Sequence, residues 1–325
     1  MSQHYHLTHP HAITWPCKYV SNNIMPSETY FPLMCMKYSI QRNVHKHAMT
    51  IQYISVMAIH EEKLKAFTHD KIKILNMVRH NNKIRVGHLK GNRFKIRLKK
   101  VLGVQKTKLD SVLEWIKANG VPNYFGNQRF GTDGNNWEDG KKLLEGKLKI
   151  RDRKTKEFLM GAYQSYLFNA WLSKRMELNL LLAQFSETET EQLLKLPEGA
   201  LKGTKSQPNF FKLVEGDVMM HYPYGRLFNV EDLQEEAKRF ESKDIAPAGL
   251  LPGKKTKRAE GTAGLIEAPF AEDINLSGAR RYAWIQVTEI KSRYIEEKAH
   301  YELSFSLPKG CYATNVLDVL RGEEA

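Results

Sequence analysis

Basic and apolar residues alternate along three stretches in the first third of the chain, at residues 71–74, 83–86 and 93–99. Because successive side chains of a strand point to opposite faces, each stretch predicts a strand with one apolar row and one cationic row. A solvated sheet face normally mixes in acids, since like charges opposite one another repel. These stretches contain none, so we favour a surface that binds a polyanion such as RNA over a plain solvated face.

Apolar residues recur at helical spacing after residue 109. The pattern predicts a helix over residues 109–118, ended by Gly120 and Pro122, and further helices over 158–176 and 231–240. Residues 246–263 are rich in Gly, Pro and Lys and predict a loop. A strand over 301–307 and a helix over 312–321 complete the pattern. The order predicts an α+β protein in which a β-rich domain is interrupted by a helix-rich insertion.

The net charge of +14 comes from one part of the chain. Residues 63–108 hold fifteen Lys or Arg and one acid, Asp70, whereas the remainder has 35 basic and 35 acidic residues. A local excess of this kind is typical of a nucleic-acid-binding surface.

Cysteine use and hydropathy bear on the compartment. The three cysteines, Cys17, Cys35 and Cys311, are scattered and odd in number, which favours a reducing environment. No apolar run reaches the roughly 20 residues needed to span a bilayer. We therefore expect a cytoplasmic protein that is not in a membrane.

Residues 121–131 read VPNYFGNQRFG, with two glycines, a proline, three aromatic residues and an arginine. The segment resembles the signature of the TruD-type tRNA pseudouridine synthases. Other segments match the same pattern in order; they are His47–Thr50 with Gln52, Arg79 and His80 with residues 89–94, residues 165–169, the looser 249–253, and residues 307–314.

The resemblance implies a pseudouridine-synthase-type antiparallel sheet domain over residues 44–112 and 286–325, and a family-specific α/β insertion domain over 113–285. It implies isomerisation of a uridine, at position 13 in the D-arm of transfer RNA, to pseudouridine. The substrate RNA is expected between the two domains. No metal or organic cofactor is implied, nor any protein partner, and we expect a monomer.

The family's nucleophile is an aspartate that lies just before the Ala-x-Thr-x-Gln run. Here His45 stands at that place, and Val44 stands where a lysine is expected. A neutral imidazole lacks the charge of a carboxylate, so the sequence predicts little or no turnover. Asp70 and Asp110 lie too far along the chain to align with it.

The resemblance also suggests roles for other residues. Phe94 matches an aromatic residue expected to stack near the target base, although its register also suits a core role, and Asn92 matches a polar residue that shapes the active-site loop. Arg129 could contact phosphate through its forked donors or brace the inter-domain loop. The residues assigned to RNA binding are Lys46, Arg79, Lys83, Arg85, Lys90, Arg93, Gln128 and Arg129.

The first 43 residues differ from the family's usual opening. They contain one acid, Glu28, and no convincing strand alternation, so we expect the N-terminal part of the catalytic sheet to be missing or scrambled. A shifted reading frame upstream of about residue 44 and a genuine divergent N-terminus on a non-catalytic, RNA-binding relative both remain open. The nearby His4, His6, His9 and Cys17 fit no common zinc spacing, so we expect no metal site.

Overall fold

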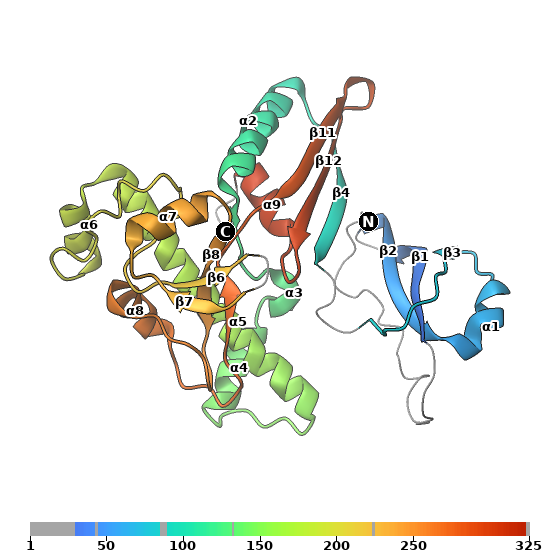
Figure 1. Cartoon of the computed structure of the whole chain (residues 1–325), viewed down its shortest axis with the longest axis horizontal. Coiled ribbons are helices and arrows are strands. Elements are labelled where there is room, and N and C mark those ends of the chain that lie inside the picture. The colour runs from blue at the N-terminus through green and yellow to red at the C-terminus, as the bar shows by residue number, and fades with distance from the viewer. Residues whose placement is uncertain (1–29, 43–44, 85–89, 132, 223–224, 323–325) are drawn as a thin grey trace. The chain divides into compact units, whose positions relative to one another are not determined.

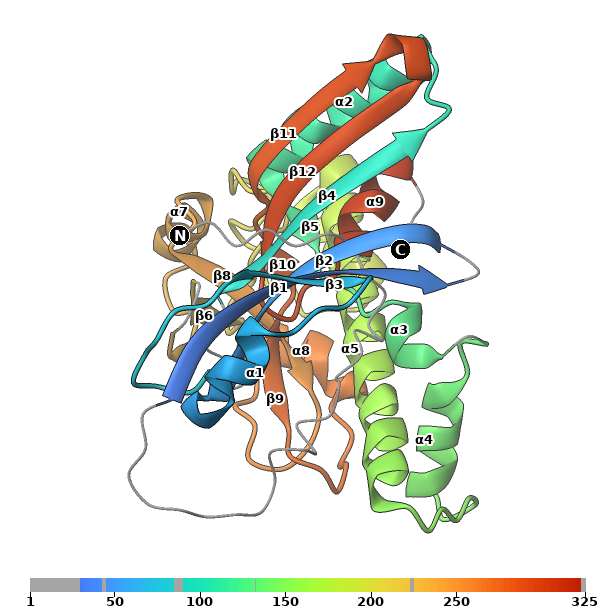
Figure 2. The ribbon, with the colours of Figure 1, turned by 90° about the vertical axis from the view of Figure 1, so that its right-hand side faces the viewer.

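The computed structural model describes residues 30–42, 45–84, 90–131, 133–222 and 225–322 (Figures 1 and 2). The described chain forms two compact units. The first holds the residues up to 108 together with 288–313, and the second holds 109–287 with the residues from 314 onward. Among the described residues, no helix is long and apolar enough to cross a membrane. The domain boundaries expected at residues 112 and 286 stay predictions.

The first sheet of the first unit corrects the prediction for the N-terminal segment. Strand β1 (Tyr30–Arg42) pairs antiparallel with both β2 (His45–Met57) and β3 (Ile72–Asn76), in the order β2-β1-β3. The absence of a strand from the first 43 residues was therefore wrong for residues 30–42, where a nearly continuous apolar run hid the two-residue period. Residues 1–29, including the four candidate zinc ligands, lie outside the described residues.

The connection after β2 is short and partly helical. A 3-10 turn (Ala58–His60) leads into helix α1 (Glu61–Lys65). The strand predicted at residues 83–86 is wrong at Lys83 and Ile84, which belong to no strand, although the Ile84 amide donates to Ser55 Oγ at 3.1 Å. Residues 85 and 86 lie outside the described residues.

The second sheet of the first unit has the order β11-β12-β4, and both ribbon views show its strands side by side (Figures 1 and 2). Its strands are β4 (Gly91–Lys99), β11 (Thr288–Ile295) and β12 (His300–Pro308). A 3-10 turn (Glu296–Lys298) joins β11 to β12. The strands predicted at 93–99 and 301–307 are confirmed.

Gly91 is required where β4 begins. A Cβ built on it would lie 2.1 Å from the Leu307 carbonyl oxygen, which is backbone and cannot swing aside. Gly91 pairs with Pro308, and the Lys309 amide donates to the Lys90 carbonyl at 3.2 Å. Two segments quoted for the family resemblance, 89–94 and 307–314, are therefore neighbours on adjacent strands.

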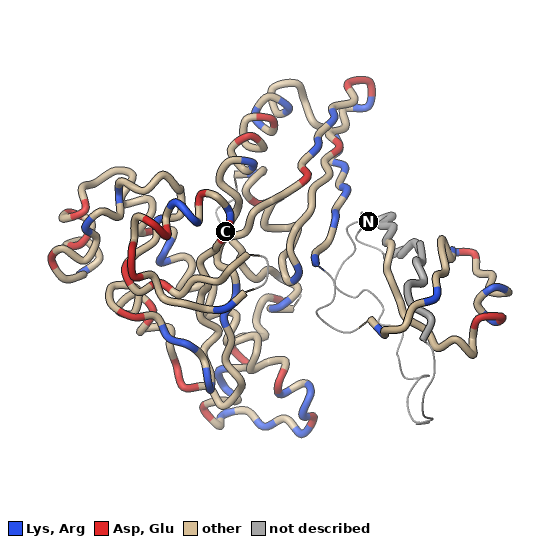
Figure 3. Tube along the Cα trace, viewed as in Figure 1, with Lys and Arg blue, Asp and Glu red and all other residues tan. Residues whose placement is uncertain are grey.

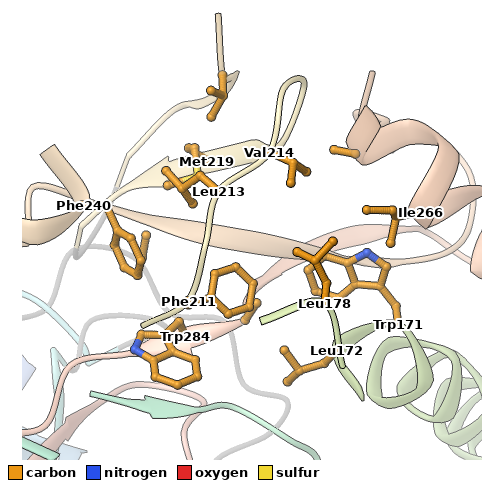
Figure 4. Close-up of a cluster of buried hydrophobic side chains, with 14 of the residues drawn as sticks. Trp171, Leu172, Leu178, Phe211, Leu213, Val214, Met219, Phe240, Ile266 and Trp284 are labelled. Atoms are coloured by element: carbon orange, nitrogen blue, oxygen red, sulfur yellow. The ribbon is translucent and has the colours of Figure 1, made fainter. Parts of the chain in front are cut away.

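The second unit is built around helix α5 (Arg153–Gln184), which contains the predicted helix 158–176. Its buried face, which includes Trp171, packs into a large apolar cluster with aromatic side chains from distant parts of the chain, including Phe211, Phe240 and Trp284 (Figure 4). The 32-residue helix is about 48 Å long at 1.5 Å per residue. It forms the framework on which the other elements of this unit pack.

A four-stranded sheet of order β7-β6-β8-β9 lies in the second unit. Its strands are β6 (Val218–His221), β7 (Leu227–Asn229), β8 (Ile245–Leu251) and β9 (Ala279–Tyr282). A separate short pair joins β5 (Val121–Pro122) to β10 (Trp284–Ile285).

The loop predicted at 246–263 is wrong at both ends. Residues up to Leu251 form the buried strand β8, and α8 (Gly261–Glu267) begins before the predicted loop ends. Pro247 lies within this strand, where its carbonyl accepts a hydrogen bond from the Ala283 amide at 2.8 Å. A Cβ on Gly249 would lie 2.3 Å from a Trp171 ring carbon, so the glycine marks close packing and not a turn.

The remaining helices follow the sequence pattern. The predicted helices at 109–118, 231–240 and 312–321 correspond to α2 (Gly103–Asn119), α7 (Leu233–Glu241) and α9 (Ala313–Arg321). The other helices are α3 (Asn127–Phe130), α4 (Asn136–Leu144), α6 (Glu187–Leu194) and a 3-10 turn (Ala268–Phe270).

Candidate functional site

One face of the β11-β12-β4 sheet carries a group of basic side chains. The pairing register places Lys95 opposite Ser304 and Arg97 opposite Glu302, and the same two β12 residues pair on their other side with Lys291 and Arg293. We call this the cationic face; its basic members are Arg93, Lys95, Arg97, Lys99, Lys291 and Arg293. Figure 3 shows Lys and Arg repeated along β4.

Two acids on neighbouring strands correct the expectation of a face without acids. Arg97 donates to Glu302 Oε1 from Nε at 3.0 Å and from Nη2 at 2.6 Å. Arg93 pairs with Glu289, and Ser306 Oγ donates to the same carboxylate at 2.6 Å. Hydrogen bonds from Arg93 and then from Ser306 hold the pKa of Glu289 below its usual value. The partners are 196 and 205 residues apart, so no local pattern revealed them.

The other four cations of the cationic face differ from Arg93 and Arg97 in their pairing. Lys95, Lys99, Lys291 and Arg293 are exposed, and none forms an ion pair with a residue that the structure describes. Four cations without an ion pair on a three-stranded sheet keep a positive potential that favours polyanions.

Asn92 and Phe94 lie on the opposite face of the same strand. The Phe94 ring packs against the fully buried Phe305 ring, with centroids 5.5 Å apart and planes tilted by 33°. Asn92 shares this side by register and pairs with Leu307. Phe94 is partly buried, so the structure gives it a packing role on this face. Stacking near a target base remains a prediction.

The signature segment is fixed by hydrogen bonds within the second unit. Asn123 is 1% exposed; its Nδ2 donates to the Tyr282 carbonyl at 2.8 Å, and its Oδ1 accepts from Arg281 Nη2 at 2.9 Å. Asn169 bonds the backbone of Phe125 twice, accepting from its amide and donating to its carbonyl, each at 2.9 Å. Two segments of the resemblance, 121–131 and 165–169, are thus joined directly.

Aromatic packing locks the same segment. The Arg281 guanidinium carbon lies 3.9 Å from the centroid of the Phe125 ring, a cation–π geometry. The Phe125 ring meets the Phe168 ring edge-on, with centroids 5.5 Å apart. Arg281 and Asn169 were not among the predicted site residues. The Asn169 position could have been found from its segment, but nothing local pointed to Arg281.

Arg129 braces helix α5. Its Nε donates to Ser165 Oγ at 2.9 Å, and its guanidinium carbon lies 5.6 Å from the Phe158 ring centroid. A Cβ on Gly161 would lie 2.4 Å from Arg129 Nη2, so a small residue at 161 makes room for this arginine. These contacts lie within the second unit, so both roles considered for Arg129, phosphate contact and bracing of the inter-domain loop, remain predictions. Gln128 is partly buried beside it in α3.

The other predicted residues are spread over the first unit. His45 and Lys46 open strand β2, where His45 pairs with Arg42; their side chains lie outside what the structure describes. Arg79 donates to Glu61 Oε2 at 2.8 Å.

Lys83 and Lys90 are exposed, and Arg85 lies outside the described residues. Among the described residues, Asn92, Arg93 and Phe94 thus lie on β4 directly after Lys90, whereas His45 and Lys46 lie on β2, Gln128 and Arg129 on α3, and Arg79 and Lys83 outside any helix or strand.

Comparison with known proteins gives the family. The sequence profile described as "tRNA pseudouridine synthase D (TruD)" matches residues 45–151 and 202–319. The chain belongs to this family. Within it, the chain is 50% identical over 281 residues to tRNA pseudouridine synthase D of Wolinella succinogenes, covering 86% of this chain and 78% of the relative. The protein of the same name from Nitratiruptor sp. is 53% identical over 274 residues, covering 84% and 76%.

A solved structure supports the TruD fold. The putative tRNA pseudouridine synthase D of Methanosarcina mazei superposes with a TM-score of 0.55 over 92% of this chain and 89% of that one. At 19% sequence identity this likeness bears on the fold alone, and it agrees with the α+β class predicted from the sequence.

Proposed function

We propose that this chain isomerises a uridine of transfer RNA to pseudouridine, and that its target is position 13 in the D-arm. The observation that carries the proposal is the similarity of 50% and more, over 84–86% of the chain, to relatives named tRNA pseudouridine synthase D. The exposed cations of the cationic face supply the electrostatic attraction that a folded RNA requires.

The reaction breaks the bond between ribose C1′ and uracil N1, turns the base, and joins C1′ to uracil C5. The base is stacked inside folded RNA, so it must first be flipped out. A carboxylate then attacks C1′ as a nucleophile or removes a proton from C2′ as a base. Asn92, on β4, would shape the active-site loop, and Phe94 would stack near the target base.

We further propose that His45, at the place of the family's aspartate, keeps turnover low in this chain. A neutral imidazole offers neither the negative charge nor the covalent adduct that the carboxylate provides. Asp70 is a poor substitute, since its side chain is exposed and 3.1 Å from His69 Nδ1. The antiparallel pairing of β1 with β2 around His45 supports a local divergence over a scrambled sheet.

The test compares wild type, His45→Asp and His45→Asn on a tRNA transcript with uridine at position 13. Pseudouridine is measured by mass spectrometry, and binding by filter retention. We expect tRNA binding by all three, little product from wild type and His45→Asn, and much more from His45→Asp. Abundant product from wild type would overturn the proposed role of His45.

The same assay separates the alternative. Salt-sensitive binding by all three proteins with no product from any of them would identify a non-catalytic RNA-binding relative. Lack of tRNA binding by wild type would end the proposal as a whole. A transcript with cytidine at position 13 is the matched substrate control, since product from it would reject the assigned target.

A further inference from the structure

A second group of cations lies at one end of the hairpin formed by α4 and α5. Residues 141–156 contain eight Lys or Arg and two acids. The basic residues are Lys141, Lys142, Lys147, Lys149, Arg151, Arg153, Lys154 and Lys156. Figure 3 shows them along the end of α4, the connection to α5 and its first turn. The charge count did not reveal this group, because the chain outside residues 63–108 has equal numbers of basic and acidic residues.

The connection between the two helices is anchored to the core. Leu148 and Ile150 pack against the buried cluster that includes Leu143 and Leu159. Lys149 and the other basic residues that alternate with these apolar anchors are exposed. The alternation fixes the cations on the solvent side, as it does in a strand.

Three of these eight cations form ion pairs with described residues and five do not. Lys142 pairs with Asp139 at 3.2 Å, Lys147 with Glu145 at 2.8 Å and Arg153 with Glu157 at 2.8 Å. The other five form no ion pair with any described residue; they are Lys141, Lys149, Arg151, Lys154 and Lys156. We call these five the hairpin cations.

Their position is unfavourable for the protein alone. Asp152 caps the positive end of α5, but the first turn that follows holds three cations, Arg153, Lys154 and Lys156, and no acid. Cations at a helix N-terminus oppose the helix dipole. A bound polyanion would reverse the sign of this interaction, so the arrangement favours binding over stability.

The hairpin is rigid enough to present them. Trp137 of α4 stacks on Tyr166 of α5, with ring centroids 3.9 Å apart and planes 7° from parallel. Asp152 caps α5 by accepting from the Thr155 amide at 2.7 Å. Cations held on a fixed scaffold lose little conformational entropy on binding.

We infer that the hairpin cations, on the second unit, bind the phosphate backbone of folded RNA in addition to the cationic face of the first unit. The inference rests on the proposed function, because it assigns the RNA to the tRNA substrate. An anionic membrane suits the site less well, since membrane-surface segments expose apolar side chains beside their cations, whereas Leu148 and Ile150 face the core.

The test uses a quadruple variant, Lys149→Gln, Arg151→Gln, Lys154→Gln and Lys156→Gln, in the full chain. A matched control replaces four exposed lysines elsewhere in the second unit, namely Lys195→Gln, Lys202→Gln, Lys238→Gln and Lys243→Gln. Both variants lose the same charge. Circular dichroism and thermal unfolding check that both fold as wild type does.

Affinity for a tRNA transcript is measured by filter retention over a series of KCl concentrations. The slope of log K against log salt is negative, and each lost phosphate contact makes it less steep by about 0.7–0.9, so the loss of four contacts makes it less steep by about 3. We expect this change for the hairpin variant and no change for the control. Equal slopes for both variants, or a preference for anionic phospholipid vesicles over tRNA, would overturn the inference. Wild type that does not bind tRNA would instead reject the proposed function.

Discussion

The buried interior of the second unit and the exposed sheet of the first unit use arginine in opposite ways. In the interior, Arg175 is fully buried and pairs with Asp217, and its Nη2 also donates to the Lys212 carbonyl at 2.8 Å. On the sheet, Arg97 pairs with Glu302 but its side chain is 54% exposed, and Lys95, Lys99, Lys291 and Arg293 form no ion pair with a described residue. The difference indicates that charge in the interior fixes the fold, whereas charge on the sheet is available to a ligand.

Breaking the buried pair should have the largest effect. Arg175→Met leaves Asp217 buried without its cation, a loss of about 3–5 kcal/mol in the free energy of unfolding. Urea denaturation followed by circular dichroism measures this loss. The matched change Arg97→Met on the sheet should cost no more than about 1 kcal/mol, because exposed pairs contribute little. Similar losses for the two variants would remove the contrast between the regions.

The Asn169 contacts test whether the signature segment behaves as part of the interior. Asn169→Leu leaves the Phe125 amide and carbonyl without their partner, which we expect to cost about 1–3 kcal/mol. Hydrogen exchange of residues 123–125 should speed up more than exchange in α5. Unchanged protection of the segment would mean that its other contacts, to Arg281 and Asn315, hold it without Asn169.

The cationic face should respond in binding and not in stability. Lys95→Gln, Lys291→Gln and Arg293→Gln together should lower affinity for tRNA by on the order of tenfold at moderate salt, because up to three phosphate contacts are lost. The thermal midpoint should stay within the small range typical of exposed substitutions. A large drop in the midpoint with unchanged affinity would give these side chains a structural role.

Glu289 gives the smallest and most local test. Its pKa lies below the usual 4.5 because Arg93 and Ser306 donate to the carboxylate. A depressed pKa contributes stability above pH 4.5 that is lost as pH falls through the lower, folded-state value. Carbon-detected NMR titration should place the Glu289 midpoint below 4.5, and Arg93→Gln should move it upward. A Glu289 midpoint that does not change on this substitution would contradict the pairing of Arg93 with Glu289.

Local patterns predicted the elements whose period is visible in a few residues. The alternation along Arg93–Phe94–Lys95 identified β4, and apolar spacing identified α5. Strand β8 was missed because proline and glycine, here Pro247 and Gly249, usually mark turns. In this strand the Pro247 carbonyl accepts from Ala283, and Gly249 leaves room for the Trp171 ring. The acids that partly neutralise β4 were missed since they lie on strands nearly 200 residues away.

The family resemblance found the signature segment, and the structure explains its composition. Asn123 and Phe125 are each held by residues more than 40 positions away, so their types are set by tertiary contacts that no period encodes. The catalytic roles of Asn92, Phe94 and His45 stay predictions.

The twin bonds between Asn169 and Phe125 bear on the order of folding. The Asn169 side chain, on a helix, forms with the Phe125 backbone the pair of hydrogen bonds that an adjacent strand usually provides. Asn169 follows Phe125 by 44 residues, so during vectorial synthesis the Phe125 backbone lacks these bonds until that amide has emerged. The signature should therefore acquire its shape late, after the long helix has formed.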